Sequence, residues 1–198
     1  MPLIVITGGI GAGKSTVMKY FAECGCSCGD ADDFVHQLYV PGGEMCRRLA
    51  ERFGDEVLNS DGSLNRKAVA DLVFGNEAEL EWLNSQIHPL VRGRIEAEAA
   101  AAADKLYFAA VPLWFECGWE GGGDVPVVAV WCDGATQRQR LLKRGWSDDE
   151  IRARLARQLS MDEKLKRADY GIMTACSWEE TRRQCDILLQ RLKHPANC

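Results

Sequence analysis

The chain has 198 residues, of which 46% are hydrophobic and 27% charged, and this composition is typical of one globular domain with room for a small insertion or lid. Its formal net charge of −5 argues against general nucleic-acid binding, which depends on Lys and Arg side chains that neutralise phosphates. No apolar run approaches the length of a membrane span, and no basic segment opens the chain, so we expect a cytoplasmic protein without a membrane partner.

The first part of the chain predicts the start of a βαβ unit. Residues 3–7 are apolar and partly β-branched, which indicates a buried strand, and glycines follow at once. Residues 15–24 have helical spacing, and residues 26–29 are predicted to form a second short strand. The acidic run at residues 30–33 follows this strand. The order strand, glycine loop, helix and strand is that of a βαβ unit.

Residues 33–103 are predicted to be mostly helical, with turns at glycine positions. Asn76 followed by Glu79 is a capping-box pattern, and it opens a long helix. Pro89 should kink this helix or end its first segment, because proline has no amide hydrogen and clashes with the preceding turn.

The second half of the chain alternates between strands and helices. Strands are predicted at residues 106–111, 125–132 and 170–173, and the glycine-rich residues 118–123 indicate a flexible loop between the first two. Residues 136–144 have helical spacing. This alternation predicts an α/β fold with a mainly parallel sheet.

Two further helices are expected from their start signals. Ser147 with Glu150 opens one of them, and Ser177 with Glu180 opens the C-terminal helix. The apolar residues of the C-terminal helix that are predicted to face inward are Ile187, Leu188 and Leu192.

The segment from Gly8 to Ser15, GGIGAGKS, matches the pattern G-x-x-x-x-G-K-[ST] between a predicted strand and a predicted helix. Glycines let the backbone wrap a phosphate chain with its N–H groups facing the oxygens, and the helix adds the positive end of its dipole. Lys14 can reach the β- and γ-phosphates, and Ser15 can give its hydroxyl to Mg²⁺. The expected contacts of a bound ATP or GTP are Gly9, Ile10, Gly11, Ala12, Gly13, Lys14, Ser15 and Thr16.

The glycine loop by itself does not distinguish kinases, ATPases and GTPases. The chain lacks the Asn-Lys-x-Asp motif with which GTPases bind guanine, and residues 106–111 are not followed by the acidic residue of a motor ATPase. Asp30 and Asp32 lie at the carboxyl end of the second predicted strand, where open α/β sheets place ligands. A carboxylate there can accept the proton of an attacking hydroxyl or help to hold Mg²⁺, and the alternative is that one of the two caps the next helix.

Nine cysteines occur, with no CxxC pair. Cys24, Cys26 and Cys28 are the densest group, but no His or second Cys pair lies nearby to complete a zinc site. Reduced thiols in a cytosolic protein are therefore favoured over a metal site.

The chain resembles the dephospho-coenzyme A kinase family over nearly its whole length. The glycine loop is generic, whereas the DAD, HP and VPL-x-x-E set in this order is specific to the family. The matching stretches are ITGGIGAGKST (6–16), GDADDFVHQLY (29–39), HPLV (88–91), VPLWFE (111–116), RLLKR (140–144) and ARLARQLSMDEKLKRADYGI (153–172).

The resemblance implies phosphorylation of the ribose 3′-hydroxyl of dephospho-CoA by MgATP, which gives CoA and ADP. It implies that Asp32 is the base facing this hydroxyl. It also implies that His88, Pro89, Leu113 and Glu116 help to form the acceptor pocket. ATP and dephospho-CoA would be the small-molecule partners, and the protein would be a monomer or a small homo-oligomer.

The expected architecture is a P-loop NTPase-type parallel sheet flanked by helices, with a helical substrate-binding region and a lid. We expect one P-loop kinase unit over residues 1–198. Its parts would be a core at about residues 1–32, 104–135 and 168–198, the helical acceptor-binding region at about 33–103, and the lid at about 136–167.

Six arginines crowd the segment between residues 138 and 157 of this acidic chain. Arg140 and Arg144 are four residues apart and therefore share a helix face, and we favour them as catalytic ligands of the γ-phosphate. Most of the others are attributed to a solvated helix face that pairs with the acidic residues 148–150.

Two alternatives stay open from the sequence. One is another small-metabolite, nucleoside or nucleotide kinase, and the other is a nucleotide-sensing module without turnover. The presence of Lys14, Ser15 and Asp32 argues against the sensor. After the last strand, residues 168–177 read ADYGIMTACS where the family commonly carries an Asp-Asn pair, so the adenine contacts stay open.

Overall fold

The computed structural model describes residues 3–73, 75–103, 105–121 and 125–193. The chain divides into two compact units. The first unit consists of Met1–Gly29 and Glu98–Cys198, and the second of Asp30–Ala97.

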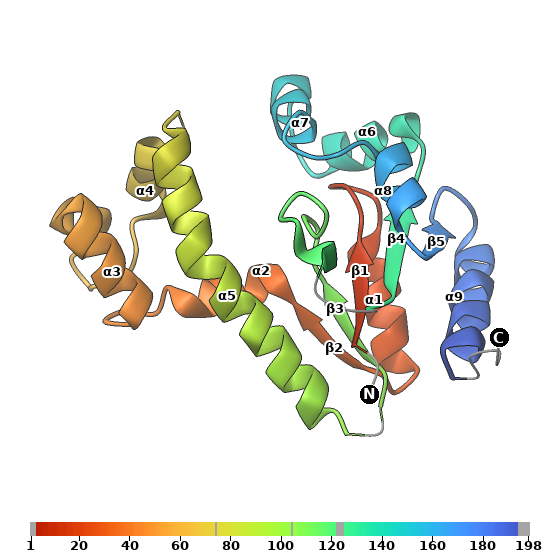
Figure 1. Cartoon of the computed structure of the whole chain (residues 1–198). Coiled ribbons are helices and arrows are strands. Elements are labelled where there is room, and N and C mark those ends of the chain that lie inside the picture. Colours follow the sequence, from red (N-terminus) through yellow and green to blue (C-terminus); the bar gives the residue numbers. More distant parts are fainter. Residues whose placement is uncertain (1–2, 74, 104, 122–124, 194–198) are drawn as a thin grey trace. The chain divides into compact units, whose positions relative to one another are not determined.

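The first unit is built on a five-stranded sheet with the strand order β2-β3-β1-β4-β5 (Figure 1). The pairs β1–β3, β1–β4 and β4–β5 are parallel. The predicted α/β fold with a parallel sheet is therefore confirmed, and the glycine loop lies at the carboxyl end of the central strand β1. The strands are β1 Leu3–Thr7, β2 Ser27–Asp30, β3 Tyr107–Ala110, β4 Val127–Trp131 and β5 Tyr170–Met173.

The helices of this unit follow the strands in the predicted alternation, with one addition. Helix α8 had not been predicted, although Ser160 and Glu163 form a capping pattern in which the Ser160 hydroxyl accepts the amide of Glu163 at 3.1 Å. The helices are α1 Lys14–Glu23, the short 3₁₀ turn η2 Trp119–Gly121, α6 Gly134–Lys143, α7 Asp148–Leu155, α8 Met161–Arg167 and α9 Trp178–Lys193.

Two predicted capping boxes are present. The Ser147 hydroxyl accepts the amide of Glu150, and the Glu150 carboxylate accepts the amide of Ser147 at 2.8 Å. Ser177 and Glu180 make the same reciprocal pair ahead of α9. Each box satisfies two amides that a helix start would otherwise leave without partners. Of the predicted glycine loop at 118–123, the part from residue 122 on lies outside the described residues.

Helices α1 and α9 pack on one face of the sheet and complete its core. Val17 and Phe21 of α1 face the sheet, and the Phe21 ring stacks on Phe108 of β3 at a centroid distance of 4.1 Å. The core residues are Ile4, Ile6, Val17, Tyr20, Phe21, Phe108, Val128, Val130, Ile172, Cys185, Leu188 and Leu189.

One prediction for α9 was wrong. Leu188 is buried, with 4% of its surface exposed, and Leu192 packs partly against the core, but Ile187 is 45% exposed. The helical period of 3.6 residues turns Ile187 away from the face that carries Leu188 and Cys185.

The second unit is helical, as predicted for most of residues 33–103. The Asn76 side chain accepts the amide of Glu79 at 3.3 Å at the start of α5. Pro89 lies inside helix α5, so the alternative that Pro89 ends a first segment is wrong. Figure 1 shows α5 as one continuous helix. The elements are α2 Ala31–Leu38, α3 Glu44–Phe53, the 3₁₀ turn η1 Asp55–Val57, α4 Arg66–Val73 and α5 Glu77–Ala101, the last of which extends beyond this unit.

Among the described residues, no helix is both long enough and apolar enough to cross a bilayer.

Adjacent residues of α9 give a test of the core. We expect Leu188→Ala to lower the free energy of unfolding by about 2–5 kcal/mol, because it opens a cavity under the sheet. Ile187→Ala should change it by less than about 0.5 kcal/mol, because that side chain is exposed. Urea denaturation of both variants measures the difference. Equal losses would show that α9 is rotated from the orientation described.

Candidate active site

The glycine loop connects β1 to α1 through backbone angles that favour glycine. Gly8, Gly11 and Gly13 have φ angles of 146°, 71° and 97°. A Cβ atom at Gly8 would lie 2.2 Å from the carbonyl oxygen of Val130 in the neighbouring strand β4. The loop therefore requires glycine at this position for space as well as for conformation.

The Lys14 side chain folds back over the loop. Its Nζ donates to the carbonyl oxygens of Gly8 at 2.7 Å and Gly9 at 2.9 Å. A lysine in this pattern reaches the β- and γ-phosphates of a nucleotide. The Lys14 ammonium therefore lies next to Gly8 and Gly9.

Backbone amides at the start of α1 are available to an anion. Within the described residues, the amides of Gly11, Gly13 and Ser15 donate to no protein acceptor, and no side chain caps α1. These donors point from a helix N-terminus, where the dipole favours negative charge. A helix start with open amides behind a glycine loop is a phosphate-binding site.

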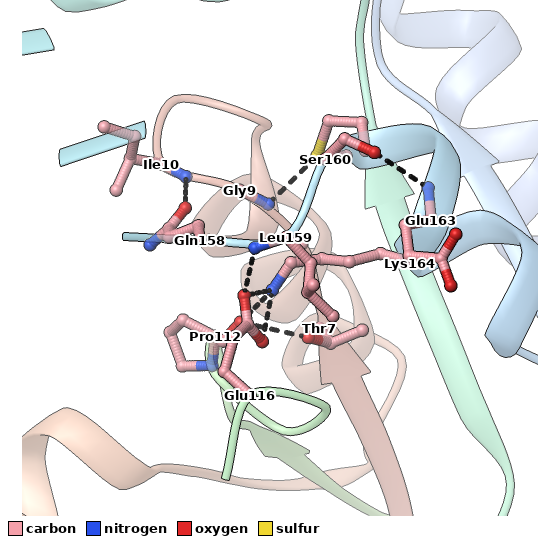
Figure 2. A network of polar contacts seen from close by, with 12 residues as sticks. Thr7, Gly9, Ile10, Pro112, Glu116, Gln158, Leu159, Ser160, Glu163 and Lys164 are labelled. Carbon is pink, nitrogen blue, oxygen red and sulfur yellow. Dashed lines mark hydrogen bonds and ion pairs between the residues drawn. The ribbon is translucent and has the colours of Figure 1, made fainter. Parts of the chain in front are cut away.

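Side chains from later in the chain bond to the peptide groups of Gly9 and Ile10 in the first half of the loop. The Ile10 amide donates to Oε1 of Gln158 at 3.2 Å, and the Ile10 carbonyl accepts from Nε2 of Gln137 at 2.7 Å. The amide of Gly9 faces the sulfur of Met161 at 3.1 Å (Figure 2). The peptide groups of Gly9 and Ile10 thus have protein partners, whereas the amides of Gly11, Gly13 and Ser15 have no acceptor among the described residues.

Arg140 lies against the end of β5 rather than in solvent. Its guanidinium donates to the hydroxyl of Thr174 at 2.8 Å and to the Thr174 carbonyl at 2.6 Å, and it is 3.4 Å from the carbonyl of Gly11. The Thr174 hydroxyl is 2.6 Å from the carbonyl of Ala12. Arg140 and Thr174 therefore brace the middle of the loop. Arg144 is the C-cap residue of α6, and its side chain is exposed.

Three of the remaining arginines have partners in the segment itself. Arg138 makes a two-bonded ion pair with Asp148, with both distances 2.7 Å, and Arg152 pairs with Asp149. The guanidinium of Arg154 lies 4.4 Å from the ring centre of Trp146. Most of these groups are exposed, so their contacts contribute little to stability.

Glu116 is at the centre of a network that joins the loop after β3 to the segment before α8 (Figure 2). Its carboxylate accepts from Nζ of Lys164 at 2.7 Å and from the amide of Leu159 at 2.8 Å. Lys164 also donates to the carbonyl of Pro112 at 2.7 Å. The side chain of Lys164 is fully buried, and this desolvation lowers its pKa, while the nearby Glu116 carboxylate opposes the shift.

Asp30 and Asp32 have different surroundings at the start of α2. Asp30 is the N-cap of α2, and its carboxylate accepts the amide of Asp32 at 2.9 Å. The Asp32 side chain is exposed in the first turn of the helix. The capping alternative thus applies to Asp30, and the Asp32 carboxylate is not used for that purpose.

The other expected acceptor residues have different surroundings. His88 is half-buried within α5, and desolvation lowers its pKa, so the neutral imidazole is favoured at pH 7. Pro89 beside it is exposed. In the first unit, Leu113 is 40% exposed in the loop after β3. Glu116 of the same loop is engaged by Lys164 and Leu159, as described above.

The three clustered cysteines carry free thiols. Burial raises the pKa of Cys28 to about 11 and also raises that of Cys26. Over the described part of the chain, no three metal-binding side chains gather in one place.

Four residues of the site carried no prediction from sequence: Gln137, Gln158, Lys164 and Thr174. Gln158 and Lys164 do lie in the stretch 153–172, and Thr174 lies in the segment after the last strand where the chain departs from the family pattern. The capping pattern of Ser160 and Glu163 would have located α8 and so the position of Lys164 within it.

The glycine loop follows the central strand of a parallel sheet, and it carries open amides and the Lys14 ammonium. This combination is that of the P-loop kinases. The family model described as dephospho-CoA kinase matches residues 2–180. The chain therefore belongs to the dephospho-CoA kinase family, whose members are ATP-dependent kinases.

Relatives and solved structures agree with this assignment. A dephospho-CoA kinase of Geobacillus kaustophilus is 37% identical over 95% of both chains, and that of Symbiobacterium thermophilum is 38% identical over 94% of this chain and 79% of the relative. The crystal structure of a Thermus thermophilus protein has a TM-score of 0.83 at 32% identity, over 96% of this chain and 97% of the other. The dephospho-CoA kinase of Campylobacter jejuni has a TM-score of 0.69 at 25% identity, over 96% of each chain. A shikimate kinase of Acinetobacter baumannii shares the fold, with a TM-score of 0.57 at 16% identity over 100% of this chain and 96% of its own.

The Thr174 hydroxyl gives a test of how the loop is braced. Thr174→Val keeps the side-chain shape but leaves the Ala12 carbonyl and the Arg140 guanidinium each short of a partner. We expect the free energy of unfolding to fall by about 1–3 kcal/mol and the KM for ATP to rise. Thr174→Ser retains the hydroxyl and should stay close to the wild type in both measurements. Indistinguishable Val and Ser variants would show that the hydroxyl does not brace the loop.

Proposed function

We propose that this protein transfers the γ-phosphoryl group of MgATP to the ribose 3′-hydroxyl of dephospho-CoA and releases CoA and ADP. The observation that carries the proposal is the match to the dephospho-CoA kinase family over residues 2–180, in a chain whose glycine loop has open amides beside a lysine. The relatives that bear this name cover nearly the whole chain.

The phosphate groups of ATP would be bound by the residues of the loop itself. The amides of Gly11, Gly13 and Ser15 are donors for the phosphate nearest α1, and Lys14 would contact the β- and γ-phosphates. The exposed hydroxyl of Ser15 is a hard oxygen ligand of the type that Mg²⁺ prefers. When bound there, Mg²⁺ would neutralise charge on the β- and γ-phosphate oxygens.

Asp32 is the residue that we propose to orient the attacking 3′-hydroxyl and to accept its proton. Its support is the family pattern at residues 29–39, the exposed carboxylate, and the use of Asp30 rather than Asp32 as the helix cap. His88, Pro89 and Leu113 are proposed to line the acceptor site. The neutral state favoured for His88 suits a packing or hydrogen-bonding group better than a proton carrier.

Arg144 is the arginine that we propose to contact the γ-phosphate, since its side chain is exposed at the end of α6. Arg140 is bound to Thr174 and lies near the Gly11 carbonyl, so its proposed contribution is to hold the loop and place positive charge beneath it. A cytoplasmic location stays a prediction from the sequence.

The first experiment measures ADP released from MgATP by the purified protein with and without dephospho-CoA. We expect release to depend on the acceptor, with one CoA formed per ADP as confirmed by mass spectrometry. Lys14→Ala should abolish the transfer and serves as the control for contaminating kinases. Binding of ATP without any stimulation by dephospho-CoA would show that the acceptor is another hydroxyl compound or that the protein is a sensor.

Asp32→Asn tests the proposed base. The amide keeps the size of the side chain but cannot accept the proton, so we expect kcat to fall by about 10²–10⁴ with the affinity for ATP nearly unchanged. Asp33→Asn is the matched control, because it removes an exposed carboxylate one position further along the same helix turn. The assignment fails if kcat and ATP affinity fall together, or if the Asp33 variant loses as much activity.

A further inference from the structure

The peptide groups at Ile10 are held from both sides by two glutamines that are distant in sequence. Gln137 of α6 donates to the Ile10 carbonyl at 2.7 Å, and Gln158 accepts the Ile10 amide at 3.2 Å. Gln137 is buried and Gln158 half-buried. A Cβ atom at Gly9 would lie 3.0 Å from Nε2 of Gln137 and 3.7 Å from Oε1 of Gln158, so both side chains reach the same turn of the loop. The direction of these peptide groups is thereby fixed by residues outside the loop.

The turn that these glutamines hold lies at the γ-phosphate end of the site. Lys14 Nζ rests on the carbonyls of Gly8 and Gly9, and this lysine reaches the β- and γ-phosphates in such loops. The open amides of Gly11, Gly13 and Ser15 lie further on, toward α1. A change in the position of Gly9 and Ile10 should therefore lower the affinity for a nucleoside triphosphate more than the affinity for a diphosphate.

Gln158 is kept in place by the buried ion pair. Leu159, the next residue, donates its amide to Glu116, and Lys164 of α8 donates to the same carboxylate and to the Pro112 carbonyl (Figure 2). Residues 158–164 are thus attached to the loop after β3 at both ends of a short segment. Met161, between these two points, is the residue whose sulfur faces the Gly9 amide.

We propose that Gln158 is a positioning residue for the γ-phosphate end of the phosphate-binding loop, and that the Glu116–Lys164 pair holds it against Ile10. Gln158 fixes the Ile10 peptide so that the loop need not rearrange when the third phosphate binds. Through this pair, the position of the loop after β3 determines where Gln158 lies relative to the nucleotide site. This inference rests on ATP being the phosphoryl donor.

Calorimetry of two nucleotides tests the proposal without an acceptor. Gln158→Met is close in volume but lacks the amide oxygen, so it separates packing from hydrogen bonding. We expect it to weaken the binding of a non-hydrolysable ATP analogue by about five- to tenfold, as the loss of one net hydrogen bond allows, and to leave ADP binding within about twofold of the wild type.

Lys164→Met tests the connection through the ion pair. We expect it to reproduce the selective loss for the ATP analogue, and the double variant with Gln158→Met to be no worse than Lys164→Met alone. Leu188→Ala is the control for general destabilisation, because Leu188 lies in the core of the same unit. It should leave the ratio of the two affinities at the wild-type value.

The outcomes separate the two proposals. Equal effects of Gln158→Met on both nucleotides, or none on either, would overturn the positioning role. Additive losses in the double variant, or an unchanged affinity ratio in Lys164→Met, would overturn the connection through the ion pair. Failure of dephospho-CoA to stimulate the wild type would instead contradict the proposed acceptor and would leave these binding results intact. A wild type that bound neither nucleotide would contradict ATP as the donor, and this inference with it.

Discussion

The phosphate-binding loop must expose amides to a ligand and still keep one shape without it. Open amides are costly when they are not solvated, and glycines give the loop little stiffness of its own. The structure meets both demands by dividing the loop. Its second half presents the amides of Gly11, Gly13 and Ser15, while its first half is bonded to Lys14, Gln137 and Gln158. Part of this stiffness is therefore supplied by Gln137 and Gln158, which lie 127 and 148 positions away from Ile10 in the sequence.

The arginines between residues 138 and 157 are of two kinds. Arg140 faces Thr174 and the loop, and its bonds are to atoms of the protein. Arg138 and Arg152 face acidic neighbours on the surface, and Arg144 is exposed. The arginines of this segment therefore range from one that is bonded to the glycine loop and to Thr174 to others that are exposed to water. This range fits a site that has to accept and release a highly charged ligand.

The features that were predicted best from the sequence are those that depend on short local patterns. The glycine motif predicted the glycine loop between β1 and α1, and the capping boxes at Ser147 and Ser177 predicted two helix starts, because each pattern depends on residues within a few positions. Ile187 was misplaced because an apolar residue type does not by itself fix the buried face. Gln158 and Lys164 could not be assigned from the residues alone, since their partners Ile10 and Glu116 are 148 and 48 positions away. The catalytic role that we propose for Asp32 rests on the resemblance to the family, and its exposed position in the first turn of α2 is compatible with that role.

Lys164 and Glu116 also constrain how this chain can change over evolutionary time. Loss of either side chain alone leaves the other charge buried without its partner, at a cost of several kcal/mol, roughly 3–5. Replacement of both side chains by apolar residues of similar volume avoids that cost. However, the two substitutions occur one after the other, so the first of them leaves a destabilised protein with one unpaired buried charge. The pair is therefore expected to be inherited as a unit. Among diverging relatives, these two positions should vary together, even though 48 residues of sequence separate them.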